Sequence, residues 1–158
     1  MTSNINDDLL KNNIDAVLDE TISDVKGIFL DRGTSFTETL STVSAEEASR
    51  TTVDDGTTVA GHIDHVRFYL RVLNNYMDGK QAGRIDWSRS WLRKGVTETE
   101  WDDLRKNLGE DLKNTRKRIS EFTDWSDERL GGALAVIAHT ALHLGAIRQM
   151  LLVIRNRG

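Results

Sequence analysis

The sequence contains no proline, and its apolar residues recur every three or four positions over long stretches. Proline breaks helix interiors, and this spacing places apolar side chains on one side of a helix. No well-bounded run alternates apolar and polar residues in the way that half-buried strands do. These features together predict an all-α fold built from four long helices.

The first two predicted helices are separated by a polar segment that is too long for a tight turn. The first should begin near Asn6, carry Val25 and Phe29 on its apolar stripe, and stop at residues 31–33, which end in glycine. The next residues are rich in serine, threonine and acidic side chains, with one short helical piece around residues 36–43. We interpret this segment, residues 34–57, as a crossover between helices.

The other three helices have clear boundary signals. The second should begin at Thr57 or Thr58 and end at Gly79, and a loop that packs Trp87 and Trp91 against the protein should follow. Thr97 to Glu100 matches a capping box, which places the start of the third helix there.

The fourth helix should be capped by Ser126 or Asp127 and run from about residue 128 to residue 155. It is apolar on nearly all sides between residues 130 and 154. A helix of this kind must be central in the fold or lie at an oligomer interface.

Composition limits the classes of function. The chain has no cysteine, which excludes disulfides, thiolate nucleophiles and cysteine metal sites, and fits a cytoplasmic protein. Its net charge of −4 gives no general attraction to phosphate, so we expect no nucleic-acid partner. The first ten residues are polar and acidic, and we expect neither a signal peptide nor a membrane-spanning helix. Residues 1–158 are expected to form a single domain.

All four histidines fall in two short segments. His139 and His143 are four residues apart, so on a helix their Cβ atoms lie about 5–6 Å apart and both rings can reach one ion. His62 and His65 are one helical turn apart, and either one can supply a third nitrogen from a facing helix. Such a pair also occurs as hydrogen-bonded core residues, so spacing alone leaves both interpretations open. Zinc, nickel, copper and iron all accept three nitrogens.

Several enzyme classes lack their signatures in this sequence. Thr140 follows His139, so the glutamate of the metalloprotease pattern is missing, which disfavours peptide hydrolysis. The sequence has no glycine-rich phosphate loop and no serine-centred elbow. Tyr69 lies four residues after His65 and can face the same pocket, although a half-buried packing role is the alternative.

Two segments resemble signatures of a known family. Residues 58–69, TVAGHIDHVRFY, resemble the second-helix signature of the DinB-like superfamily, and residues 139–149, HTALHLGAIRQ, resemble its fourth-helix signature. Residues 29–33, 86–91 and 96–101 are similar to a branch of the same superfamily. The resemblance implies a four-helix bundle whose helices run up, down, down and up, with a long crossover between the first and second helices.

The resemblance also implies a metal site. In the second-helix pattern of the superfamily a metal ligand lies six residues after the opening valine or isoleucine, which from Val59 is His65. His139 and His143 match the other two ligand positions, and His62 then becomes a neighbour that supports a ligand. We expect a divalent ion, zinc or nickel, at this site.

The activity is a separate question because one fold hosts many functions. Some members of the superfamily are metal-dependent transferases or isomerases that use a low-molecular-weight thiol. We therefore hypothesise an enzyme that transfers such a thiol to a small electrophile. The alternatives are a non-catalytic metal-binding or interaction protein that acts as a homodimer through its last helix, and a bundle without metal. A homodimer is expected from the resemblance and from the apolar last helix.

Overall fold

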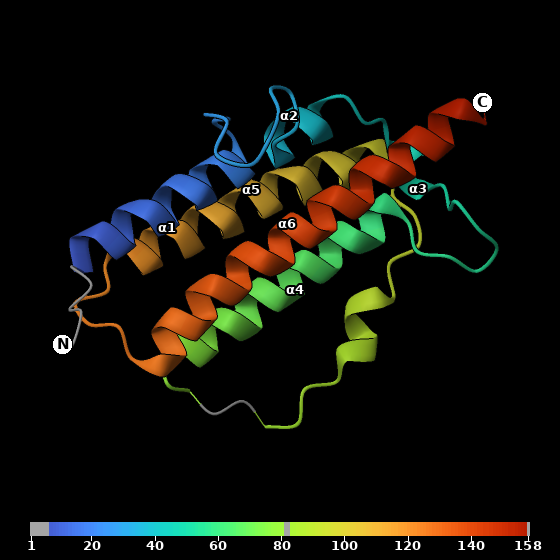
Figure 1. Cartoon of the computed structure of the whole chain (residues 1–158). Helices are drawn as coiled ribbons and strands as arrows, with labels where there is room; N and C mark the ends of the chain where they lie inside the picture. Colours follow the sequence, from blue (N-terminus) through green and yellow to red (C-terminus); the bar gives the residue numbers. More distant parts are fainter. Residues whose placement is uncertain (1–6, 81–82, 158) are drawn as a thin grey trace.

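The computed structural model describes residues 7–80 and 83–157, and within these residues it is helical with no strand. Four long helices lie side by side (Figure 1): α1 (Asp7–Ile22), α4 (Val59–Met77), α5 (Glu98–Ser120) and α6 (Asp127–Asn156). The prediction of an all-α fold is confirmed.

The long helices enclose the hydrophobic core. α4 packs against α5 and α6, and α1 packs against the same two helices. Fully burying a leucine, isoleucine or phenylalanine side chain stabilises a fold by about 1.5–3 kcal/mol. The largest apolar side chains with almost no exposure come from every long helix and from the segment after α1: Trp101, Phe36, Leu18, Ile63, Leu70, Leu108, Leu144, Ile147 and Ile154.

Three of the predicted helix starts are confirmed. The Thr58 side chain accepts the backbone N–H of Gly61 at the start of α4, and Thr97 forms a complete capping box with Glu100 at the start of α5. Ser126 is the cap of α6. Each cap satisfies an amide that has no partner inside its helix.

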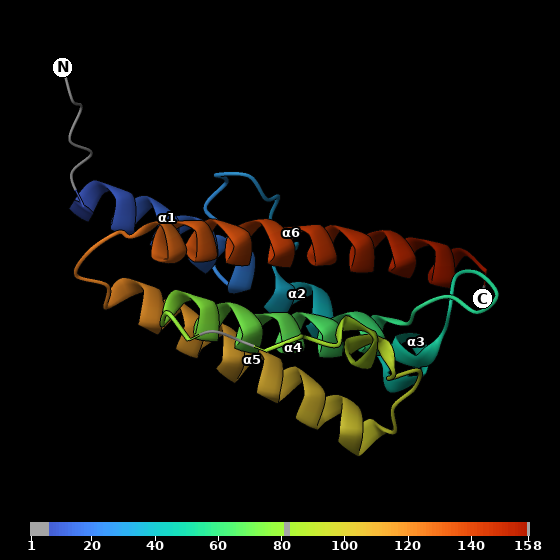
Figure 2. The same ribbon diagram turned by 90° about the horizontal axis from the view of Figure 1, so that it is seen from below.

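Two short helices lie between α1 and α4. α2 (Phe36–Ser41) matches the short piece expected around residues 36–43, whereas α3 (Ala45–Ser49) was not predicted. Each begins at a serine whose side chain accepts the N–H of a glutamate three residues later. Figure 2 shows α3 at the end of the bundle where α4 and α5 begin, and α3 packs against both.

The first helix is shorter than predicted. The start that we placed near Asn6 lies outside the described residues, but α1 ends at Ile22, well before residues 31–33. Val25 and Phe29 therefore lie in a loop and not on a helical stripe. The chain leaves the helix because residues 26–30 wrap around the side chain of Glu20.

The Glu20 carboxylate is a buried acceptor for this loop. It accepts the backbone N–H groups of Lys26 and Ile28 at 2.9 Å, of Phe29 at 2.7 Å and of Leu30 at 2.6 Å. Burial raises the pKa of Glu20, but the four N–H donors outweigh burial and lower this pKa to about 2. The ionised Glu20 side chain thus accepts hydrogen bonds from backbone N–H groups that have no helical partner in this loop.

By length and composition alone, α6 could cross a membrane, since an 18-residue window of it has a mean hydropathy of 1.6. The core helix of a soluble protein passes the same test. Here α6 packs its inner side against α1 and α4.

We predict that Glu20 makes stability depend on pH. A carboxyl whose pKa falls from 4.5 to about 2 on folding stabilises the folded state above pH 4.5, and this contribution is lost as the pH falls towards 2. Glu20→Gln should lower Tm at neutral pH, because an amide has only one acceptor oxygen for four donors, and should flatten the loss of Tm across this pH range. Glu110→Gln, at an exposed position of α5, is the control. Identical acid profiles for Glu20→Gln and the wild type would contradict the prediction.

Candidate metal centre

The contact between α4 and α6 gathers all four histidines. His62 and His65 lie one turn apart on α4, and His139 and His143 lie one turn apart on α6. The rings of His65 and His143 have their centroids 4.9 Å apart, and those of His65 and His139 have theirs 5.0 Å apart. The two histidine segments seen in the sequence thus form one cluster.

Three of the four histidines turn a nitrogen to a common point. His139 Nε2 lies 3.1 Å from His65 Nε2 and 3.1 Å from His143 Nε2, and each of the three residues offers a ligand atom within 4.8 Å of the others. In a tetrahedral zinc site with bonds of about 2.0–2.1 Å, ligand nitrogens lie roughly 3.3–3.4 Å apart. The spacing of these nitrogens fits a single ion.

The hydrogen bonds of Ser90 determine which ring nitrogen of His65 carries the hydrogen. The Ser90 hydroxyl has one hydrogen, which it donates to the carbonyl oxygen of Trp87 at 2.6 Å. Ser90 Oγ also lies 2.7 Å from His65 Nδ1, so His65 must be the donor in that bond. A neutral His65 then carries its hydrogen on Nδ1 and presents the lone pair of Nε2 to the cluster.

A similar chain of bonds supports His143. Its Nδ1 lies 2.8 Å from Nδ1 of His62, and Nε2 of His62 lies 3.1 Å from the hydroxyl of Thr57. If His143 Nδ1 donates to His62 and His62 Nε2 donates to Thr57, the Nε2 lone pair of His143 is free for a ligand bond. His62 therefore contacts His143, a candidate ligand, at its Nδ1 atom. The nitrogens of His62 are not among the three that converge.

His139 is held by stacking. Its ring lies on that of Tyr69, with centroids 3.5 Å apart and planes 5° apart. Its Nδ1 is buried and has no hydrogen-bond partner among the residues that the structure describes. Tyr69 thus lies at the cluster, in contact with one candidate ligand.

Burial keeps the cluster uncharged. Only 7% of His65 and 7% of His143 is exposed. Burial, aided by repulsion between the rings, lowers the pKa of His62 and of His139 to about 4 and that of His143 to about 3, and burial alone lowers the pKa of His65. Neutral imidazoles are the form that binds metals, so at neutral pH no proton has to leave first.

A short 3₁₀ helix, η1 (Trp87–Trp91), covers the cluster. The Trp91 ring stacks on His65, with centroids 3.9 Å apart and planes 15° apart. The loop after η1 lies directly on α4: a Cβ atom at Gly61 would come within 2.8 Å of the carbonyl oxygen of Arg93. Arg93 also forms an ion pair with Asp64 at 3.4 Å.

The role of Ser90 was not predicted from the sequence. It lies 25 positions after His65, in a segment that we expected only to pack its tryptophans. The one available signal was that residues 86–91 were similar to part of the DinB-like superfamily.

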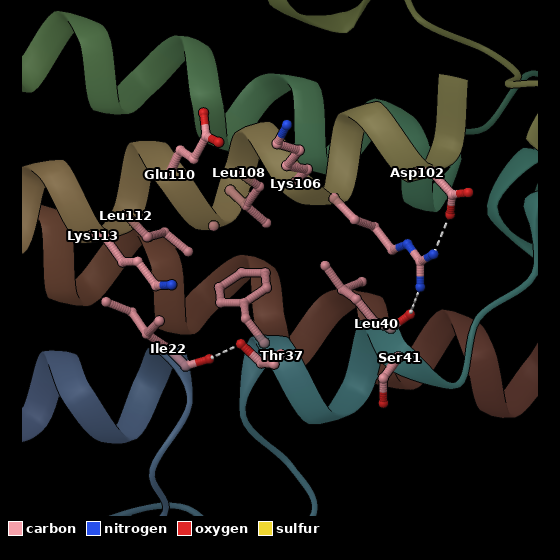
Figure 3. A pocket seen from close by; sticks show the side chains of 13 residues that line it. Ile22, Thr37, Leu40, Ser41, Asp102, Lys106, Leu108, Glu110, Leu112 and Lys113 are labelled. Carbon is pink, nitrogen blue, oxygen red and sulfur yellow. Dashed lines mark hydrogen bonds and ion pairs between the residues drawn. The ribbon is translucent and has the colours of Figure 1, made fainter. Parts of the chain in front are cut away.

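A separate cavity of about 500 Å³ lies between α2 and α5 (Figure 3). Apolar side chains such as Leu40, Leu108 and Leu112 line it, and so does Arg105, which bonds to Asp102 and to the Leu40 carbonyl oxygen. None of the four histidines lines this cavity. The histidine cluster and the cavity are therefore different places in the molecule.

Comparison with known proteins gives a family match. The family described as the DinB superfamily matches residues 30–147, which is more than half of the chain and includes all four histidines. No curated protein and no solved structure matches significantly. The three-histidine cluster and the family match both suggest a metal site. The resemblance seen in the sequence is confirmed, and the chain belongs to the DinB superfamily.

Proposed function

We propose that His65, His139 and His143 bind one divalent ion, zinc or nickel, and that the protein is an enzyme that transfers a low-molecular-weight thiol to a small electrophile. The observation that carries the metal proposal is the convergence of three Nε2 atoms, two of them 3.1 Å from the third. Three protein ligands leave a coordination position open, as catalytic sites do and closed structural sites do not.

A bound ion would hold a thiol sulfur in the open position and favour its thiolate form. Other side chains of the protein would orient the rings of the metal ligands. Ser90 holds the hydrogen of His65 on Nδ1, and His62 can do the same for His143. The rings of Trp91 and Tyr69 lie against the cluster and exclude water from its sides.

We also propose that the helices run up, down, down and up, with residues 23–58 as the crossover, in a single domain over residues 1–158. The helix directions in Figure 1 support this topology, since α1 and α6 start at one end of the molecule and α4 and α5 start at the other. The shared hydrophobic core supports the single domain. We place the protein in the cytoplasm, a proposal that rests on its lack of cysteine.

We predict that metal binding needs His143 more than His62. Protein freed of metal with a chelator should bind one zinc or nickel ion per chain, measured by titration calorimetry and elemental analysis. His143→Ala should abolish stoichiometric binding because it removes a ligand. His62→Ala should weaken binding by only about 10–100-fold, as expected for a residue that supports a ligand. Unchanged binding in His143→Ala, with the helical circular dichroism intact, would rule out the three-histidine site.

Ser90 should matter for affinity although it does not reach the ion. Ser90→Ala removes the acceptor of the His65 hydrogen, and we expect the zinc dissociation constant to rise by about 10–100-fold. Ser88→Ala, in the same turn, is the matched control, since the Ser88 hydroxyl bonds to Asp86 and to no histidine. Equal affinities of the two variants would show that the bond between Ser90 and His65 does not orient the ligand.

Catalysis is tested separately from binding. Metal-loaded protein should accelerate the reaction of at least one thiol, from a panel of low-molecular-weight thiols, with a chromogenic aryl halide. His143→Ala should lose this acceleration, since it loses the ion. Acceleration that survives in His143→Ala would end the enzyme proposal. Tight metal binding without any acceleration would favour the non-catalytic alternative.

A further inference from the structure

The cavity between α2 and α5 has the size and the lining of a small-molecule site. Its volume of about 500 Å³ lies within the range of ligand pockets, about 300–1,000 Å³. Apolar side chains that are themselves almost fully buried line it: Ile22, Phe36, Leu40, Leu108 and Leu112. Walls of this kind favour a ligand with an apolar body, because both surfaces leave water when they meet.

Hydrogen bonds hold the walls of this cavity together (Figure 3). The Thr37 hydroxyl of α2 donates to the carbonyl oxygen of Ile22, the last residue of α1, at 2.8 Å. Arg105 of α5 donates to the Leu40 carbonyl oxygen of α2 at 3.3 Å. These bonds tie α2 to both neighbouring helices, so the cavity is formed before a ligand arrives. A preformed site loses little conformational freedom on binding.

The charged residues that line the cavity leave one ammonium group without a partner. Three of them are bases and two are acids. Arg105 and Asp102 bond to each other. Lys106 and Glu110 have opposite charges one helical turn apart, and both extend away from α2 in Figure 3. Lys113 instead extends towards the end of α1, and no residue in the described part of the chain bonds to its ammonium group. The charge of the lining therefore favours an anion.

We propose that this cavity binds a small amphipathic carboxylate, with its apolar body against the buried leucines and its carboxylate on Lys113. An ammonium group donates strong hydrogen bonds to a carboxylate. A neutral apolar ligand would fill the cavity without using this charge, and a cation would be repelled by it. The site is independent of the proposed metal centre, because none of the four histidines lines it.

Gly109 leaves room for the ligand. It lies on α5 three residues after Lys106 and four before Lys113, so the three residues share one side of the helix and all of them line the cavity. A Cβ atom at Gly109 would meet nothing within 4 Å, so close packing does not require a glycine there. A large side chain at this position would enter the space that the ligand needs without removing any core residue.

Titration calorimetry with octanoate, octanol and octylamine tests the class of ligand, since these probes share one chain length and differ in the head group. One octanoate should bind per chain, about tenfold or more tightly than either other probe, as expected for a hydrogen bond between charged groups. His143→Ala should bind octanoate as the wild type does, with or without zinc, which excludes binding at the metal. Equal affinities for the three probes, or no binding of octanoate, would overturn the proposal.

Two substitutions locate the site. Lys113→Gln should weaken octanoate binding by about tenfold or more, whereas Lys113→Arg should retain it. Lys117→Gln is the matched control, because Lys117 lies one turn later on α5, outside the cavity, and pairs with Glu121.

Filling the cavity should have a larger effect. Gly109→Leu should abolish octanoate binding while the circular dichroism stays helical. Gly131→Leu, at an exposed glycine of α6 where a Cβ atom also meets nothing within 4 Å, should bind octanoate normally. Octanoate affinity that is unchanged in both Lys113→Gln and Gly109→Leu would overturn the proposal, because the carboxylate would then bind elsewhere on the protein.

Discussion

The histidine cluster depends on how α4 packs against α6. Four imidazoles lie at this contact, and buried polar groups are costly unless they find hydrogen-bond partners. Hydrogen bonds offset the cost of burying His65 and His143, since the Nδ1 atom of His65 bonds to Ser90 and that of His143 bonds to His62. Both rings are thereby turned so that their Nε2 atoms approach that of His139. The bonds that make burial tolerable are the same bonds that aim the nitrogens at one point.

A segment distant in sequence completes this arrangement. η1 places Ser90 and Trp91 on His65, and the loop after it can lie close to α4 because residue 61 is a glycine. An alanine there would bring its Cβ within 2.8 Å of a backbone carbonyl oxygen. The orientation of a candidate ligand therefore rests on the packing of a loop as well as on the two helices.

α6 is apolar nearly all round because its buried side packs in the core and its exposed side also carries apolar residues. Its inner side carries His139 and His143 among core residues such as Leu144 and Ile147. The exposed residues on its outward side between residues 131 and 152 include no ionisable side chain. Sequence periodicity shows a helix clearly when one side is polar, but here it gave only the choice between a central helix and an interface helix. The structure shows an apolar surface on the outside as well as a buried inside.

The sequence by itself determined the helical class, the caps at Thr58, Thr97 and Ser126, and the pairing of histidines within each helix. These features depend on contacts between residues at most four positions apart. Only the tertiary structure decided that α1 stops at Ile22, because the Glu20 carboxylate takes its hydrogen bonds from a loop several residues away. In the structure His65 joins the converging nitrogens, while His62 bonds to the Nδ1 atom of His143. Spacing alone left this choice open, and before the structure only the family resemblance favoured His65. Such distances follow from how one helix packs on another, and helical periodicity does not encode that.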